Sequence, residues 1–227
     1  MEKVVVNARP PQIVYDTVDA LNKTGYLSVY PVFSASGAQI FAVTNSNISS
    51  TEEVRYIYCD TATGAVPNLT ITYAKVLSAD IDLPFNISQN VEGNVYFDIP
   101  LGAVNTSSTN NFFVQTSCAL YKVNSAGTET LINTKNIEVN MDIQTQNVAV
   151  AHNAFFPINT SGALHFNIGE TLRLRLNLLA KTGLGTDTGH ISYGINPSNS
   201  AWSYWTLVYP ASGPTRQTWL LPIKLDT

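Results

Sequence analysis

The stretch Thr171-Leu172-Arg173-Leu174-Arg175-Leu176-Asn177-Leu178 alternates polar and apolar residues with a period of two. Successive side chains of an extended strand point to opposite faces, so its four leucines share one face and its polar residues the other. The stretch therefore predicts a β-strand with one buried and one solvated side. We expect it to lie at the centre of a sheet, with the leucines in the core.

The same period recurs in four further stretches, at 81–87, 95–99, 137–143 and 164–168. From residue 26 onward, short strand candidates, among them 69–77 and 80–88, alternate with loops rich in Gly, Pro, Asn and Ser. One such loop, 124–128, predicts a β-hairpin with a five-residue connection. Many strands with one wet face, joined in part by longer loops, predict an all-β protein: an antiparallel β-sandwich of jelly-roll type.

The chain is expected to form one domain preceded by an arm. Pro10 and Pro11 force an extended segment, and 15–22 is the one convincing candidate for a short helix. We therefore expect residues 1–25 to be an extended N-terminal arm or edge element, and 26–227 to be the β-sandwich. Two packed β-domains are the alternative.

The composition is poor in charge. Charged residues make up 12% of the 227 residues, and 16 acidic against 12 basic residues leave a net charge of −4. Without a basic stripe, a nucleic-acid partner is disfavoured. No apolar run reaches the ~18 to 20 residues of a membrane span, and the interrupted start does not resemble a signal peptide.

A search for chemistry returns no recognisable site. The three histidines, His152, His165 and His190, are isolated from one another in sequence, so no metal cluster is indicated. No Gly-X-Ser-X-Gly nucleophile motif occurs. A pair of acids from distant parts of the chain would escape such a search. The sequence nevertheless predicts that the protein is not an enzyme and that it has no catalytic residue, metal or cofactor.

Two cysteines, Cys59 and Cys118, both fall in predicted strands. Two buried free thiols are favoured over a disulfide between them, because no dense cysteine framework signals an oxidising compartment.

An aromatic cluster at 201–209 offers a candidate binding surface. Trp205, Leu207 and Tyr209 would share one strand face and pack in the core, whereas Trp202 and Tyr204 could be displayed as a ligand or receptor contact. A packing or subunit-interface role is favoured there over a sugar platform. Six Asn-X-Ser/Thr triplets are candidate glycosylation sites, headed by Asn22, Asn47, Asn68, Asn86, Asn105 and Asn159.

The segment 169–181, which contains the opening strand, is followed by Gly189-His190-Ile191-Ser192-Tyr193-Gly194-Ile195-Asn196-Pro197. Together they resemble a closing hairpin of jelly-roll capsid decoration or turret proteins of phages and archaeal viruses. The likeness covers about the C-terminal third of the chain, and other β-sandwich binding modules could produce it.

The resemblance implies a virion structural protein, an outer capsid, decoration or turret component. Such a protein would assemble with copies of itself as a trimer or ring, contact a major capsid protein through its arm, and turn its loops outward. It would lie on the capsid exterior after assembly in the host cytoplasm. The alternative is a carbohydrate- or receptor-binding β-sandwich module of a viral spike or fibre that contacts a host-surface glycan.

Overall fold

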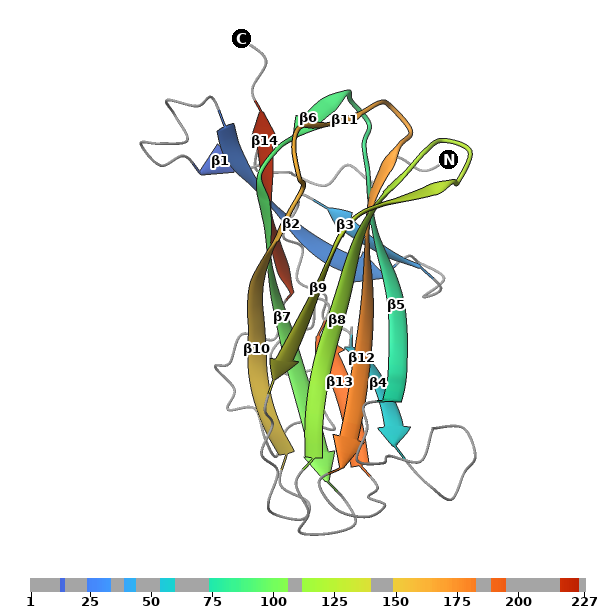
Figure 1. The fold of residues 1–227 in the computed structure, drawn as a ribbon, viewed down its shortest axis with the longest axis vertical. Coiled ribbons are helices and arrows are strands. Elements are labelled where there is room, and N and C mark those ends of the chain that lie inside the picture. Colours follow the sequence, from blue (N-terminus) through green and yellow to red (C-terminus); the bar gives the residue numbers. More distant parts are fainter. Residues whose placement is uncertain are drawn as a thin grey trace.

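The computed structural model describes residues 13–14, 24–33, 39–43, 54–59, 74–105, 112–139, 149–182, 189–194 and 217–224. Their regular structure consists of strands, with no helix among them (Figure 1). The all-β class predicted from the sequence is confirmed. The bounds of the strands are β1 Ile13–Val14, β2 Thr24–Phe33, β3 Ile40–Val43, β4 Val54–Cys59, β5 Ala74–Pro84, β6 Gln89–Val91, β7 Asn94–Asn105, β8 Phe112–Val123, β9 Glu129–Val139, β10 Ala149–Asn159, β11 Leu164–Phe166, β12 Thr171–Thr182, β13 Gly189–Gly194 and β14 Thr218–Lys224.

The strands join into one 14-stranded sheet, whose main path runs β4-β13-β7-β14-β2-β3-β5-β12-β8-β9. Strand β2 links its two halves, because its first part pairs with β14 and its last part with β3. The pairing of β3 with β5 is parallel, so the sheet is mixed and the expectation of a purely antiparallel one is corrected. The sheet curls into a half-barrel (Figure 1).

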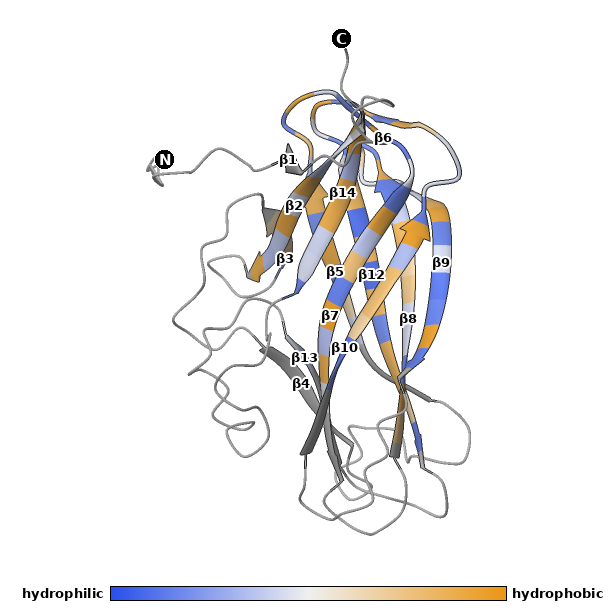
Figure 2. Ribbon diagram, turned by 90° about the vertical axis from the view of Figure 1, so that its left-hand side faces the viewer, coloured by the Kyte–Doolittle hydropathy of each residue, from blue (hydrophilic) through white to orange (hydrophobic). Residues whose placement is uncertain are grey.

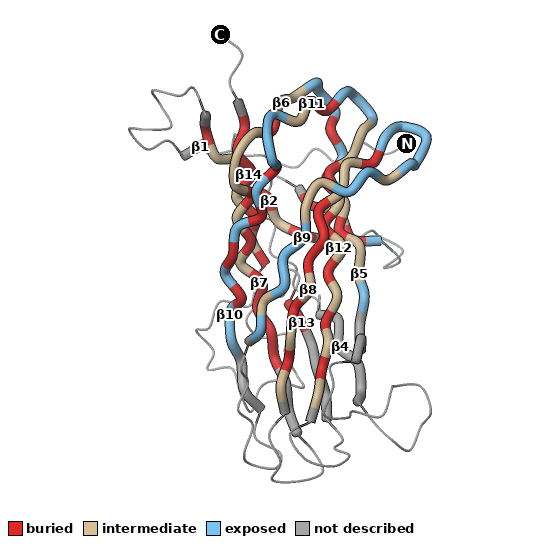
Figure 3. Tube along the Cα trace, viewed as in Figure 1, coloured by how far each residue is buried: buried red, intermediate tan, exposed pale blue. Residues whose placement is uncertain are grey.

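Strand β12 is central, as its periodicity predicts. It pairs with β5 on one side and with β8 on the other. Leu172, Leu174, Leu176 and Leu178 are each at most 1% exposed. Buried and exposed residues alternate along the strands, as the pleat requires (Figure 3).

The opposite wall of the core comes from β7 and β14. Phe97 on β7 and Trp219 on β14 are fully buried, and their ring centroids lie 5.2 Å apart in an edge-on arrangement. Both belong to the same hydrophobic cluster as the leucines of β12. The curl of the sheet thus closes one continuous core between strands that lie far apart in the sequence.

The predicted hairpin at 124–128 joins β8 to β9. The side-chain oxygen of Asn124 accepts hydrogen bonds from the backbone N–H groups of Ala126 (3.0 Å) and Thr128 (2.8 Å). Gly127 has φ +84°, which glycine adopts without strain. Local turn chemistry therefore fixes this connection.

Strands β9 and β10 border a seam in the half-barrel. Each is hydrogen-bonded along one side, β9 to β8 and β10 to β7, and the described residues show no ladder between them. The side-chain amide of Asn133 on β9 donates to the carbonyl oxygen of Asn159 on β10 at 3.0 Å. The two strands separate below this contact (Figure 2).

Part of the predicted arm lies in this structure: β1 pairs with β2, with Val14 opposite Tyr26. The helix expected at 15–22 falls outside the described residues, and the division into arm and sandwich stays a prediction. The sequence also predicted a strand break between 77 and 80. The structure instead continues β5 through both expected strands, because its residues pair with β12 along their whole length, with one register shift.

Candidate functional site

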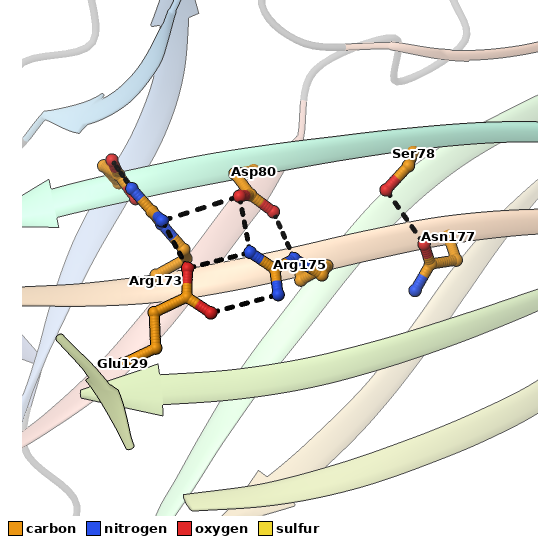
Figure 4. A network of polar contacts seen from close by, with 7 residues as sticks. Ser78, Asp80, Glu129, Arg173, Arg175 and Asn177 are labelled. Carbon is orange, nitrogen blue, oxygen red and sulfur yellow. Dashed lines mark hydrogen bonds and ion pairs between the residues drawn. The ribbon is translucent and has the colours of Figure 1, made fainter. Parts of the chain in front are cut away.

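A cluster of five charged side chains occupies the solvated face of β5, β12 and β9 (Figure 4). Arg175 binds both carboxylate oxygens of Asp80, at 2.7 and 2.8 Å, and Arg173 binds those of Asp82, at 2.6 and 2.7 Å. Glu129 lies between the two guanidinium groups, 2.6 Å from Arg173 and 2.9 Å from Arg175. The arginines of β12 are thus shared among carboxylates from β5, its direct neighbour, and from β9, which lies beyond β8.

These contacts favour the charged forms of Glu129, Arg173 and Arg175. Hydrogen bonds from Arg175 and then from Arg173 lower the pKa of Glu129. Hydrogen bonds to the carboxylates raise the pKa of both arginines. A carboxylate kept ionised in this way is a poor proton donor near neutral pH. The cluster is therefore a set of ion pairs that holds neighbouring parts of the sheet together, rather than an acid–base site.

The sequence predicted a solvated face for Arg173 and Arg175 but not their partners. The available signal was the spacing: Asp80 and Asp82 are two residues apart, as are the two arginines, and the register places each Arg directly opposite an Asp. Opposite charges facing each other across a strand pair stabilise the sheet.

A second candidate surface lies on the outer side of β10, β7, β14 and β2, which lie side by side in Figure 2. We define this aromatic face by Tyr26, Tyr96, Asp98, Phe155 and Leu220. The ring centroid of Tyr96 is 5.9 Å from that of Phe155, with the two planes 12° apart, and 5.9 Å from that of Tyr26. Phe155 is 64% exposed. The face is a row of aromatic rings that runs diagonally across the sheet, because Phe155, Tyr96 and Tyr26 lie at successive levels along the strands.

Asp98 lies in the middle of the aromatic face, directly opposite Phe155 on β10 and Thr218 on β14. Its Oδ1 is buried and receives no hydrogen bond from the described residues. Burial raises the pKa of this carboxyl group, and a hydrogen bond with Asn153 opposes the rise. Unlike Asp80 and Asp82, Asp98 therefore has no cation to hold its charge among the contacts that the structure describes.

Trp202 and Tyr204, the predicted contact residues, lie outside the described residues, and so do Asn22, Asn47 and Asn68. Asn105 ends β7, and its side chain is not described. Asn86 is exposed in the loop after β5. Asn159 is exposed too, but its Nδ2, the atom that a glycan would take, donates to Oδ1 of Asn94 at 2.9 Å. All six triplets stay predictions.

Cys118 is a free, buried thiol, and burial raises its pKa, which makes it unreactive in the folded chain.

The described part of the chain contains no group of three or more His, Cys, Asp and Glu that could hold a metal ion. It likewise contains no helix able to cross a membrane.

No protein-family model matches the sequence, and no curated protein matches it. Among solved structures, the chain is similar to a CocE/NonD family hydrolase from Staphylococcus aureus, with a TM-score of 0.45, 11% identity, and coverage of 95% of this chain and 40% of the other. A second structure of that hydrolase gives a TM-score of 0.47 at 10% identity, covering 89% and 37%.

The chain is also similar to VP2 of infectious bursal disease virus in a subviral particle. The TM-score is 0.31 at 11% identity, over 88% of this chain and 42% of VP2. This chain thus spans about two fifths of the length of the structures that it matches.

One prediction from the sequence is corrected by these comparisons. The chain was expected not to be an enzyme, and that exclusion is wrong, because the structures that it matches include those of a hydrolase. The viral matches, in turn, are to VP2 of infectious bursal disease virus in subviral and T=1 particles, and they do not single out phages or archaeal viruses.

Proposed function

We propose that this chain is a virion structural module that forms interfaces with further copies of itself. The observation that carries the proposal is the pair of long edge strands, β9 and β10, which border the open seam of the half-barrel. Each has 11 residues. An edge strand presents unpaired backbone groups, and an isolated protein usually shortens, charges or covers such an edge.

Assembly would cover these edges. A strand from a neighbouring copy that pairs with β9 supplies the missing backbone partners, and many modest contacts of this kind stabilise a closed ring or shell. In this proposal the fold is of jelly-roll type, the assembly is a trimer or ring on a major capsid protein, and the module is an outer decoration or turret component. It lies on the capsid exterior after assembly in the host cytoplasm.

The test adds charge to one edge. Thr134 and Asn136 on β9 are exposed, and lysines on an edge strand oppose pairing with another chain. We expect the purified chain to form a defined oligomer by light scattering, and Thr134→Lys with Asn136→Lys to shift it to monomer. The matched control places the same two charges at the hairpin tip, as Ser125→Lys with Ala126→Lys, and leaves the oligomer intact.

A chain that stays monomeric at high concentration contradicts the proposal, as does an oligomer that both double variants preserve. Quantitative mass spectrometry of purified particles gives the second measurement. A shell component is present in many copies, whereas a spike or fibre component is present in few.

A further inference from the structure

We propose that the aromatic face binds a neutral saccharide. This binding function goes beyond the edge-strand assembly proposed above and is tested separately from it, because the assembly test changes β9, whereas the rings come from β2, β7 and β10. Three independent properties of the face support it: the row of rings, the neighbouring polar groups and the absence of cations among its described side chains.

The rings provide the stacking surface. Tyr26, Tyr96 and Phe155 come from three strands, and successive centroids are 5.9 Å apart. The apolar C–H face of a pyranose packs against an aromatic ring, while its hydroxyl groups stay available to polar neighbours. Because the row crosses several strands, it offers successive rings to an extended oligosaccharide rather than a single pocket to one sugar.

Polar groups that suit hydroxyls lie beside the rings. Asn153 is exposed on β10, two residues from Phe155, and Asp98 lies opposite Phe155 on β7. Amides both donate and accept hydrogen bonds, and a carboxylate accepts them, so this set can pair with hydroxyl groups in either role. The rings can therefore contact the apolar face of a saccharide while the neighbouring polar side chains bind its hydroxyl groups.

Charge selects the class of ligand. Among the described side chains that β10, β7, β14 and β2 turn outward, none is Lys or Arg, and Asp98 is the carboxylate. Sulfated, sialylated or phosphate-bearing ligands would find no cation among these side chains, which do not include that of Lys224, the last residue of β14. A dry apolar protein partner would cover Asn153 and the accessible part of the Asp98 side chain without bringing hydrogen-bond partners, which is costly, whereas a polyol brings hydroxyl groups. The face thus favours a neutral saccharide over an acidic one and over a second protein.

The experiment is native affinity electrophoresis in gels that contain hydroxyethylcellulose, galactomannan or xylan, followed by calorimetric titration with the corresponding hexasaccharides. Heparin serves as the acidic probe. We expect retardation by at least one neutral polysaccharide and none by heparin. Phe155→Ala should weaken hexasaccharide binding about tenfold, equivalent to about 1.4 kcal/mol, and Phe155→Tyr should preserve it.

The matched control is Ile87→Ala. Ile87 is 66% exposed, slightly more than Phe155 at 64%, and lies in the loop between β5 and β6, outside the aromatic face. Its substitution should leave binding unchanged, and circular dichroism should show all variants folded. Three results would each overturn the proposal: no retardation by any neutral polysaccharide, binding that survives Phe155→Ala, or a Phe155→Ala effect confined to self-association.

Discussion

The charged cluster on β5, β12 and β9 should stabilise the fold measurably, and a double-mutant cycle on Arg175 and Asp80 isolates one of its contacts. Arg175 makes a two-pronged contact to Asp80, at 2.7 and 2.8 Å, and its guanidinium lies 4.9 Å from the centre of the Tyr121 ring. The Arg175 and Asp80 side chains keep 29% and 34% of their surface exposed, so solvent screens the pair in part.

The magnitude follows from this geometry. An exposed ion pair contributes about 0.2 to 1 kcal/mol, while a two-pronged charge-assisted contact in a network exceeds a neutral hydrogen bond. We therefore expect a coupling energy of about 1 kcal/mol between Arg175→Met and Asp80→Asn. Arg175→Met alone should cost about 2 kcal/mol, because Glu129 loses one of its two arginines as well.

The assay is urea unfolding of the wild-type chain, the two single variants and the double variant, with the free energies of unfolding compared at equal m-values. Ser78 and Asn177 provide the control cycle, since Ser78 Oγ donates to Asn177 Oδ1 at 2.9 Å between the same two strands (Figure 4). That neutral, exposed pair should couple by no more than a few tenths of a kcal/mol. An Arg175–Asp80 coupling no larger than that of the neutral pair would refute the reasoning.

Three further predictions concern buried groups. Leu174 is fully buried in the central strand, so Leu174→Ala should cost about 2 to 5 kcal/mol and Leu174→Asp should abolish the cooperative thermal melt; an unchanged melt would show that the strand is not core. Burial raises the pKa of Asp98, so the stability linked to its protonation is present at low pH and is lost as pH rises through the folded-state pKa. Asp98→Asn should therefore raise the melting temperature near pH 7 and have little effect below about pH 3.9, the ordinary aspartate value; equal effects at both pH values would contradict this. In a Cys59→Ser background, Cys118 should react with a thiol reagent at the rate of global unfolding, because it is buried and its pKa is raised; fast labelling of the native chain would show an accessible thiol.

Local sequence determined the strand content and part of the connections. The period of two in 171–178 is a property of neighbouring residues, and it correctly placed the leucines of β12 in the core. The turn at 124–128 depends on contacts among neighbouring residues, chiefly those of Asn124 and Gly127, which is why it was predictable. The same local reasoning was wrong at β5. It predicted two strands there, whereas pairing with β12 keeps these residues in one continuous strand.

Tertiary structure alone decided which strands meet. Arg173 and Asp82 are 91 positions apart, and their contact depends on the register between β12 and β5, which no local pattern encodes. The same holds for the aromatic face, where Tyr26, Tyr96 and Phe155 reach one surface from three strands. Backbone conformation follows from short-range sterics and side-chain alternation, so the sequence by itself determined that this is a β protein. Strand order and the curl of the sheet follow from the burial of one shared hydrophobic core. The charged cluster, the seam between β9 and β10 and the aromatic face therefore exist only in the folded chain.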